Sequence, residues 1–368
     1  MKICSKEISS HTAGRYPVKQ QEIYSQFAHQ VKTGILKPGD KLPIREQLIP
    51  QYNSTSNTIQ RSIDMMVEDG LLVTIPRKGT FVAEKPSCLY RYAVVFSNEI
   101  NDPNWRGLDS AIYKLLAQFE SETDCEFFVY DGINTNNRVN KTIIDELETD
   151  ISTGRLAGVF YASNPYYLEK YPSIMESKTP SIAIKKADSD SFPIVNFNNH
   201  SLINEMVDHL VAEGCKNIAM YLPLGSGDHH LDTYQRALTR NRLVYDQSWV
   251  MGISFKYPQW INNHVQLLLG HNAALKPDGL IVMDDTLAPY ILNSIEEFNL
   301  NIENEIKVIS HANMLSDSGV DTRVNFDRMG FNIRELIEYC LKNMRDQFEG
   351  KSFESCYMLE PFFRAANT

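Results

Sequence analysis

A group of short polar and forked side chains near the N-terminus has the residue types that bind the edges of DNA bases. Amide and guanidinium side chains make paired hydrogen bonds to base edges in the major groove, and hydroxyl groups bind phosphate. The group occupies consecutive turns of one segment and comprises Ser56, Asn57, Thr58, Gln60 and Arg61. Apolar residues recur beside it at helical spacing, namely Ile59, Ile63, Met66 and Val67. The polar group is therefore expected on the outer face of an amphipathic helix.

The surrounding pattern supplies the elements that would position this helix. Thr55 is an N-cap residue for a helix over 55–68, and Gly70 ends it. Apolar stripes predict two earlier helices over 20–31 and 45–52. Two short apolar runs, 71–74 and 79–82, flank the turn Pro76-Arg77-Lys78 and predict a β-ribbon wing. Helix-turn-helix plus wing is a DNA-binding geometry. The expected DNA contacts are Arg45, Thr55, Ser56, Asn57, Thr58, Gln60, Arg61, Arg77, Lys78 and Gly79.

The distribution of charge agrees with this reading. Residues 1–85 contain 12 Lys and Arg against 8 Asp and Glu, a net charge of +4, within a chain whose net charge is −10. A mildly basic head on an acidic body suits a polyanion-binding module carried by a domain that does not itself bind polyanions.

Several motifs of the head resemble the N-terminal domain of the GntR family of bacterial transcription regulators. The matching runs are Gly34 to Pro43, Asn57-Thr58-Ile59, Glu68 to Leu72 and Lys78 to Val82. The resemblance covers about residues 17–84 and implies a winged helix that binds double-stranded operator DNA. The family usually has Arg where this chain has Glu46, Ser56 and Gln60, whereas Arg45 and Arg61 stand one residue away. Because Gln and Asn pair with adenine, we expect an operator that depends less on guanine.

The rest of the chain alternates short apolar runs with amphipathic helices. Runs at 92–97, 126–130, 156–162, 181–184, 217–222, 278–283 and 306–309 predict strands, and 105–119 predicts a helix. Such alternation predicts parallel sheets with helices on both faces. The fold class expected for the whole chain is α/β, with an N-terminal winged helix-turn-helix and a two-lobed, periplasmic-binding-protein-like domain. The expected division is a polar tail over 1–16, the winged helix over 17–84, a linker over 85–90 and a two-lobed domain over 91–368.

The sequence lacks the motifs of the common catalytic and metal sites. The chain has no nucleotide-binding glycine loop, no nucleophile elbow and no kinase motif, so catalysis is not expected. Six dispersed cysteines form no C-x-x-C pair, and no histidine cluster has metal-ligand spacing, so neither a metal nor a cofactor is expected. No apolar run approaches the length of a membrane span, and no secretion signal precedes residue 17, which predicts a cytoplasmic protein.

The body resembles the effector domain of the LacI family, whose fold is shared with periplasmic sugar-binding proteins. The resemblance spans about residues 91–340 and rests on ordered short runs such as 93–97, 180–184, 209–219 and 277–285. It implies a sugar or sugar derivative bound at the carboxyl ends of the strands, between two lobes. The implied ligand-binding residues are Trp105, Tyr161, Lys185, His230, Phe255, Asp285 and Asn313.

Three positions of this set depart from the family. His230 stands where an Arg usually binds the sugar, Lys185 where Asp is common, and Asp284-Asp285 replace Asn-Asp. The ligand is therefore expected to differ from the family's commonest ones. Lys185 would suit an acidic sugar, and an ion pair with Asp188 or Asp190 is the alternative for it. For each residue of the set a purely structural role stays open.

Together these features predict a ligand-responsive transcription regulator without enzymatic activity. The expected protein is a homodimer, paired mainly through its body, that represses transcription until a monosaccharide closes the lobes and reorients the heads. Two alternatives remain: a sugar-processing α/β enzyme with an added DNA-binding head, and a body that docks other proteins.

Overall fold

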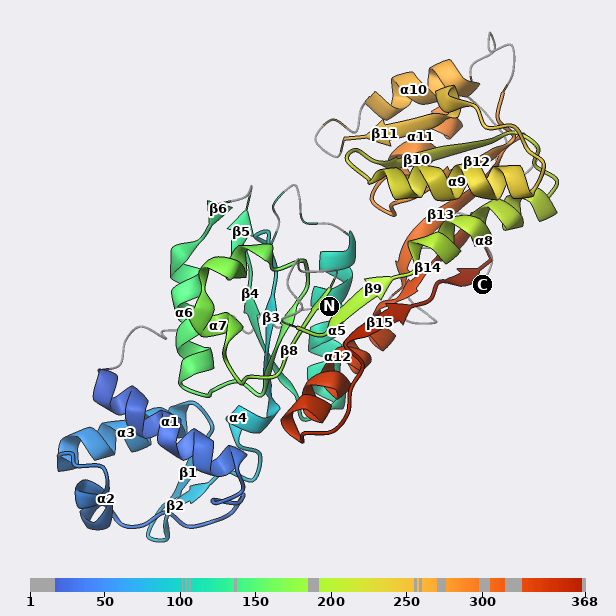
Figure 1. Ribbon diagram of the computed structural model, residues 1–368. Helices are drawn as coiled ribbons and strands as arrows, with labels where there is room; N and C mark the ends of the chain where they lie inside the picture. The colour runs from blue at the N-terminus through green and yellow to red at the C-terminus, as the bar shows by residue number, and fades with distance from the viewer. Residues whose placement is uncertain are drawn as a thin grey trace. The chain divides into compact units, whose positions relative to one another are not determined.

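The computed structural model describes residues 17–100, 102, 105, 107–135, 138–184, 192–254, 257, 260–269, 276–297, 305–314 and 326–365. The chain divides into two compact units. The first unit contains Met1–Ile100, Leu116–Ile194 and Cys340–Ser355, and the second contains Asn101–Leu115, Val195–Tyr339 and Cys356–Thr368. The chain therefore passes between the units several times, as a two-lobed domain requires (Figure 1).

The N-terminal part of the first unit is a winged helix-turn-helix. Its elements are α1 (Val18–Lys32), α2 (Arg45–Gln51), α3 (Ser56–Glu68), β1 (Leu72–Ile75), β2 (Gly79–Val82) and α4 (Ser87–Tyr90). β1 and β2 pair antiparallel, from Leu72 opposite Val82 to Ile75 opposite Gly79. The apolar faces of the helices meet in one cluster that includes Phe27, Leu48, Ile59 and Met66. We call residues 17–90 the head.

The segment expected to be a linker is folded. Residues 87–90 form the short helix α4, and Cys88 is fully buried in the same cluster as the three longer helices of the head. Ser87 N–H donates to the Gly70 carbonyl at 3.2 Å. The chain therefore leaves the head through packed structure and enters β3 (Arg91–Val95) directly.

The rest of the first unit is an α/β lobe, which we call the first lobe. Four neighbouring strands of its sheet are β3, β4 (Glu126–Tyr130), β7 (Gly158–Tyr161) and β8 (Ser181–Ile184), in the order β8-β7-β3-β4, and these neighbours are parallel. One face of this sheet is covered by α6 (Lys141–Ser152) and the short α7 (Pro172–Met175), whose apolar residues pack with Val95, Val159 and Ala183 (Figure 1). All five residues of β3 are buried, which explains the apolar run after Arg91, from Tyr92 to Val95.

The remaining elements of this region are short or cross between the units. They are α5 (Gly107–Glu122), the hairpin β5 (Asn134–Thr135) and β6 (Arg138–Val139), the 3-10 helix η2 (Tyr166–Lys170), β9 (Ile194–Phe197), α12 (Ile333–Phe348) and β15 (Cys356–Leu359).

The second unit is a second α/β lobe. Its sheet has the order β11-β10-β12-β13-β14-β16, parallel except for the last pair. The strands are β10 (Ile218–Pro223), β11 (Val250–Ile253), β12 (Gly279–Val282), β13 (Lys307–Met314), β14 (Asp327–Asn332) and β16 (Phe362–Arg364). The helices are α8 (Asn199–Ala212), α9 (Asp228–Arg240), the 3-10 helix η3 (Gln247–Trp249), α10 (Trp260–Leu269) and α11 (Ala288–Glu297).

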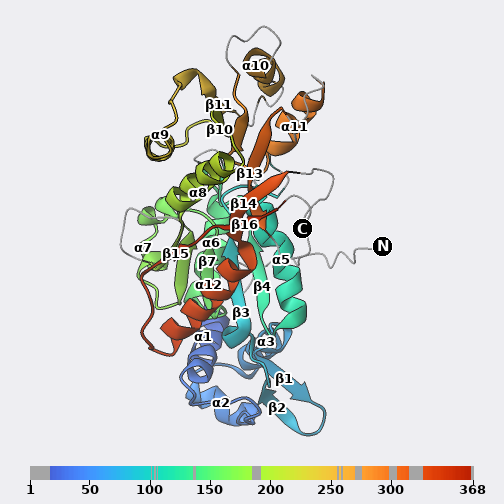
Figure 2. The ribbon, with the colours of Figure 1, turned by 90° about the vertical axis from the view of Figure 1, so that its right-hand side faces the viewer.

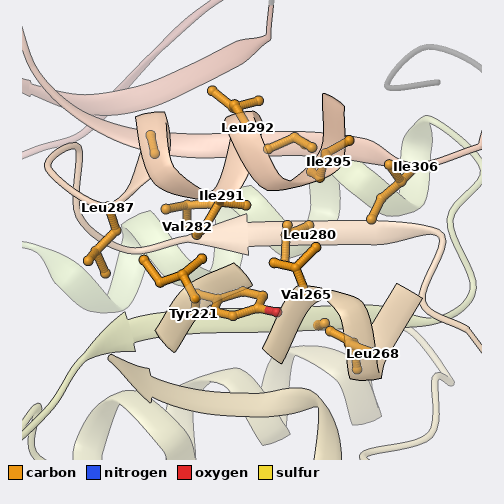
Figure 3. Close-up of a cluster of buried hydrophobic side chains, with 14 of the residues drawn as sticks. Tyr221, Val265, Leu268, Leu280, Val282, Leu287, Ile291, Leu292, Ile295 and Ile306 are labelled. Atoms are coloured by element: carbon orange, nitrogen blue, oxygen red, sulfur yellow. The ribbon is translucent and has the colours of Figure 1, made fainter. Parts of the chain in front are cut away.

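Helices cover both faces of this second sheet. α10 and α11 pack on one face, where Tyr221, Leu280 and Val282 meet Val265 and Ile291 (Figure 3). α8 and α9 lie on the opposite face (Figures 1 and 2). The parallel arrangement brings the carboxyl ends of β10, β12 and β13 to one edge, and this is where open α/β sheets bind ligands.

Candidate functional site

The outer face of α3 carries the polar group expected to read DNA. Ser56, Asn57 and Arg61 are exposed, and Thr58 and Gln60 are partly exposed. On the opposite side Ile59 and Met66 are buried in the core of the head. The helix thus presents its first two turns to solvent while its apolar face fixes it to α1 and α2.

Two of the expected contacts also start the helix. Thr55 is the N-cap residue, and its hydroxyl accepts from the Thr58 backbone N–H at 3.2 Å. The two hydroxyl groups also lie 3.0 Å apart. Thr55 and Thr58 therefore stabilise the N-terminal turn whether or not they contact DNA.

The amide of Gln60 already has a partner on the same helix. Gln60 Nε2 donates to Asp64 Oδ1 at 2.7 Å, and Asp64 is exposed. Asp64 lies one turn beyond Arg61 on the stripe that starts at Asn57. Its carboxylate would repel phosphate, so the N-terminal half of α3 is the half suited to enter the groove.

Replacing Asp64 by Asn is expected to tighten DNA binding about fivefold at low salt, since one charge at 4 Å in water is worth about 1 kcal/mol. The gain should appear with every DNA sequence and shrink as salt is added. Fluorescence anisotropy with a labelled duplex measures it. Glu169→Gln removes an exposed charge from η2 in the first lobe and should change nothing; equal effects of both variants would exclude a local role for Asp64.

The wing extends a basic turn beyond the head. Arg77 and Lys78 are exposed, and Lys78 N–H donates to the Ile75 carbonyl at 3.1 Å, which closes the turn. Arg77 has a φ of 64° and Gly79 a φ of 120°, so the turn uses left-handed backbone at both ends. The close contact between Lys41 and Gly79 adds a basic residue that the sequence reading missed: a Cβ on Gly79 would lie 2.9 Å from Lys41 Cε. The signal was present, because Lys41 belongs to the run Gly39-Asp40-Lys41-Leu42.

Replacing Arg77 and Lys78 together by Ala is expected to weaken binding to all DNA sequences alike. A plot of the logarithm of the association constant against the logarithm of the salt concentration has a negative slope. Each lost phosphate contact should make this slope less steep by about 0.9. Titrations at several salt concentrations measure both quantities. Lys170→Ala in η2 is the matched control, and an unchanged slope in the double variant would remove the wing from the interface.

Arg45 is the first residue of α2 and is exposed. A cation at a helix N-terminus is opposed by the helix dipole, so local structure does not favour this residue. Contact with phosphate would account for its position.

The carboxyl ends of β12 and β13 bring together two of the expected ligand-binding residues. Asp285 Oδ2 accepts from the backbone N–H of Asn313 at 3.1 Å and from its side-chain Nδ2 at 2.9 Å. Asp285 Oδ1 is buried and has no hydrogen-bond partner among the residues that the structure describes. The site therefore holds a fixed carboxylate with one oxygen available to a donor.

Two further groups lie beside Asp285 or beside its partner Asn313. His311, two residues before Asn313 on β13, has a buried Nδ1 that also lacks a partner within the described residues. Gly107, at the start of α5, approaches so closely that a Cβ would lie 2.2 Å from Asp285 Oδ1. Only glycine fits there without displacing the carboxylate. His311 was not expected from the sequence, because its position became clear only once β13 was seen to reach Met314.

The neighbouring Asp284 is held in a different way. Its Oδ1 accepts from the Thr286 backbone N–H at 2.9 Å and from the Thr286 hydroxyl. Burial raises the pKa of Asp284 above its ordinary value of 3.8, and Asp285 raises it further, against the hydrogen bonds from Thr286.

This raised pKa predicts a pH-dependent stability difference between the wild-type protein and Asp284→Asn. A carboxyl whose pKa is higher in the folded state contributes stability below its unfolded pKa, and that contribution is lost as pH rises through the folded pKa. Asn does not titrate, so the variant should gain stability relative to the wild type as pH rises from about 4, the unfolded pKa, through the higher folded pKa. Urea unfolding across this range measures the difference, and a constant difference would contradict the assignment.

The other expected ligand-binding residues are not brought to this carboxylate by any contact described. Tyr161 is fully buried in the core of the first lobe, where its ring centroid lies 5.5 Å from that of Phe192 and burial raises the pKa of its hydroxyl. Trp105 meets Tyr113 edge-on at 6.1 Å. His230 lies on α9, with its ring 4.0 Å from that of His229. Lys185 and Phe255 lie outside the described residues.

An aromatic cavity of about 190 Å³ lies at the end of β11 in the second lobe. Its walls include Ser254, Asn263 and His264, together with the stacked rings of Tyr257 and Trp260, whose centroids are 4.7 Å apart. It shares no lining residue with the Asp285 site. The cavity offers a flat apolar surface, whereas the buried acceptor suited to a hydroxyl donor lies at Asp285.

Comparison with known proteins identifies the parts of the chain. Residues 19–82 match the model of bacterial regulatory proteins of the gntR family. The head is a GntR-family domain. The region 207–350 matches the model of the periplasmic binding protein-like domain. Among the described residues, no group of three His, Cys, Asp or Glu could hold a metal ion, and no helix has the length and apolar character needed to cross a membrane.

The GntR head is also similar to the corresponding part of regulators of known name. It is 30% identical over 64 residues to the histidine utilization repressor of Klebsiella aerogenes, covering 17% of this chain and 27% of that protein. It is 32% identical over 72 residues to the repressor YtrA of Bacillus subtilis, covering 18% and 55%. The chain thus spans about a quarter to about half of these relatives.

The body has the fold of LacI-family regulators. The Escherichia coli repressor ascG aligns with a TM-score of 0.59 at 13% identity, covering 76% of this chain and 99% of that chain. The regulator CcpA of Lactococcus lactis aligns with a TM-score of 0.56 at 15% identity, covering 75% and 98%. At these identities the likeness establishes the fold alone. The expected combination of a GntR head with a LacI-like body is confirmed.

Proposed function

We propose that the protein is a ligand-responsive transcriptional repressor. A GntR head and a periplasmic-binding-protein-like body on one chain is the observation that carries the proposal. The head supplies an exposed polar helix and a basic wing, and the body supplies a lobe with a buried acceptor at its strand ends. The protein acts in the cytoplasm as a homodimer on a palindromic operator.

The ligand in this proposal is a monosaccharide or a close derivative. Hydroxyl groups of a sugar donate hydrogen bonds, and Asp285 Oδ1 is an anionic acceptor without a partner among the described residues. In this proposal the ligand binds more tightly to the conformation that has the lower affinity for DNA. This preference sets how far the ligand can shift the protein away from DNA, since a ligand shifts an equilibrium only by its preference for one state. The proposed ligand contacts are Asp285, Asn313, Trp105, Tyr161, Lys185, His230 and Phe255.

Two measurements on the full-length protein test this function. Selection from a random duplex library is expected to enrich one palindromic sequence. Calorimetric titration with pentoses, hexoses, deoxyhexoses and uronates is expected to give saturable binding without product. Turnover of a sugar would favour the enzyme alternative instead, and no heat with any sugar together with specific DNA binding would favour the docking alternative.

A further inference from the structure

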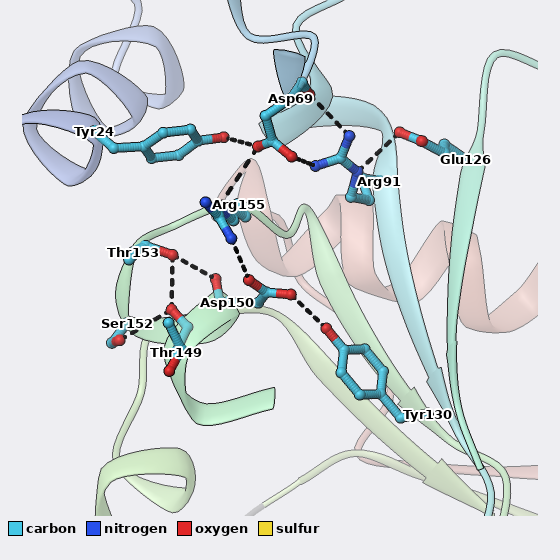
Figure 4. A network of polar contacts seen from close by, with 10 residues as sticks. All are labelled: Tyr24, Asp69, Arg91, Glu126, Tyr130, Thr149, Asp150, Ser152, Thr153 and Arg155. Carbon is cyan, nitrogen blue, oxygen red and sulfur yellow. Dashed lines mark hydrogen bonds and ion pairs between the residues drawn. The ribbon is translucent and has the colours of Figure 1, made fainter. Parts of the chain in front are cut away.

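The C-terminal end of α3 is attached to the first lobe by a buried network of charges, which we call the Asp69 junction. Asp69 is the C-cap residue of α3, immediately before Gly70. Its carboxylate and carbonyl meet Tyr24 of α1, Arg91 at the start of β3, and Arg155 in the turn before β7 (Figure 4). The helix expected to read DNA is therefore bonded at its far end to the body.

Every oxygen of Asp69 faces a donor from another element. Arg91 Nη1 donates to Oδ1 at 2.6 Å, and Arg91 Nη2 donates to the backbone carbonyl at 2.8 Å. The Tyr24 hydroxyl donates to Oδ2, and Arg155 Nε lies 3.7 Å from the same atom. The side chains of Arg91 and Arg155 are only 5% and 9% exposed, so water competes little for these contacts.

The network continues into the first lobe through a second carboxylate. Arg155 Nη1 donates to Asp150 Oδ1 at 2.9 Å, and the Tyr130 hydroxyl donates to Asp150 Oδ2 at 2.6 Å (Figure 4). Asp150 is 1% exposed. Arg91 Nε in turn donates to Glu126 Oε2 at 2.8 Å. From Asp69 outward the charges alternate in sign, through Arg91 to Glu126 and through Arg155 to Asp150, so each ion of the junction has an opposite ion beside it.

A second contact joins the same two parts independently of Asp69. Lys32 Nζ, at the end of α1, donates to the Leu156 carbonyl at 2.6 Å. Beside it, the turn at Gly154 packs on α1, since a Cβ at Gly154 would lie 3.5 Å from Ala28 Cβ. With the folded segment 87–90, these contacts leave the head no flexible connection to the first lobe.

We infer that the head and the first lobe move together as one rigid unit. Asp69 is the positioning residue that fixes α3 to the first lobe. Separating the two parts would break the ion pairs that join Asp69 of the head to Arg91 and Arg155 of the first lobe and leave the Asp69 carboxylate without either cation, which is strongly unfavourable. A conformational change occurs more easily where no buried ion pair has to break. A change in the ligand-binding domain therefore reaches the head as a movement of the whole first lobe. The orientation of the recognition helices then follows the first lobes.

Distance measurement in the full-length protein tests the rigid attachment. The exposed residues Ile35 of the head and Ala117 of α5 are replaced by Cys and spin-labelled, after Cys4, Cys125 and Cys356 are changed to Ser. Double electron-electron resonance, measured on labelled protein diluted into unlabelled protein, should give one narrow distribution of the distance between the two spin labels. A broad distribution in this otherwise intact protein would overturn the inference.

Variants identify the junction as the cause. Asp69→Asn should broaden the distribution at least twofold, and Asp69→Glu, which retains the charge, should restore most of the narrow component. Asp64→Asn lies on the same helix and touches no residue of the first lobe in the described contacts, so it should have no effect. If Asp69→Asn fails to fold, Glu126→Gln is a milder variant. It weakens the ion pair between Arg91 and the half-exposed Glu126, and it should broaden the distance distribution by less than twofold. Unchanged distributions in the folded variants would show that Asp69 does not position the head.

The consequence for DNA rests on the proposed function. In selection from a random duplex library, the intact protein should enrich half-sites at one spacing, and Asp69→Asn should enrich the same half-site over several spacings. Enrichment at one spacing by both proteins would overturn the positioning role. If the intact protein enriches no DNA at all, the proposed function fails, while the distance measurement still decides the rigid attachment.

Discussion

Asp285→Asn is expected to bind sugar at least tenfold more weakly than the wild-type protein, because a hydrogen bond to a charged group contributes about 1.5 to 3 kcal/mol. Asn can still present one oxygen to the N–H groups of Asn313, which now hold Oδ2. It places an NH₂ group where the buried Oδ1 stands, and an amide donor does not accept the hydroxyl proton of a sugar. Calorimetry with the sugar selected from the panel measures the loss.

The same substitution is expected to leave stability unchanged or to raise it. Oδ1 of Asp285 is a buried charge oxygen without a partner among the described residues, and such an atom costs folding free energy. In the proposed function, a donor group of the ligand offsets this cost. The thermal unfolding midpoint without sugar should therefore not fall in Asp285→Asn.

Asp278, which precedes the other end of β12, offers the matched control. Its carboxylate accepts from the backbone N–H groups of Lys216 and Asn217 at 2.8 to 3.0 Å. Asp278→Asn should therefore lower stability by about 1 to 3 kcal/mol and retain sugar binding. Full sugar affinity in Asp285→Asn, or equal loss of affinity in both variants, would contradict the assigned role of Asp285.

The sequence predicted most of the elements but not the contacts that join them. Strands β4 and β8 begin and end where the sequence predicts, and β8 is buried throughout, as a continuous apolar run in a parallel sheet implies. β14 was missed, since Asp327–Asn332 is polar at both ends and contains Gly330. The structure explains this glycine: a Cβ there would lie 1.9 Å from the Ala312 carbonyl oxygen. Close approach between strands is not visible in a local pattern.

The sites show the same difference between local and long-range information. The outer face of α3 follows from helical periodicity, so its exposed residues could be predicted. The Asp69 junction could not, because Tyr24 and Arg91 lie 45 and 22 residues from Asp69 and only the packed head brings them together. Asp285 and Asn313 were named through a family resemblance, and the strand order of the second lobe explains why they meet.

Replacing Asn57 and Arg61 together by Ala is expected to lower affinity for the selected operator by at least about thirtyfold. Both side chains are exposed one turn apart on α3, and each bidentate contact with a base is worth about 1 to 3 kcal/mol. Affinity for unrelated duplex DNA should fall much less, because that binding depends on the total charge of the interface. The ratio of the two affinities, measured at fixed salt, is the specific readout.

Arg61→Lys separates base reading from charge at this position. Lys keeps the charge but lacks the planar fork that binds two acceptors at once, so a base-reading Arg61 predicts a loss in Arg61→Lys close to that of Arg61→Ala. The head should remain folded in both variants, since Ile59 and Met66 hold α3 from the opposite side. Operator affinity retained in Arg61→Lys would assign Arg61 to phosphate instead. Sequence discrimination by this helix would then depend on Asn57 and Gln60, and Gln60 must first release Asp64.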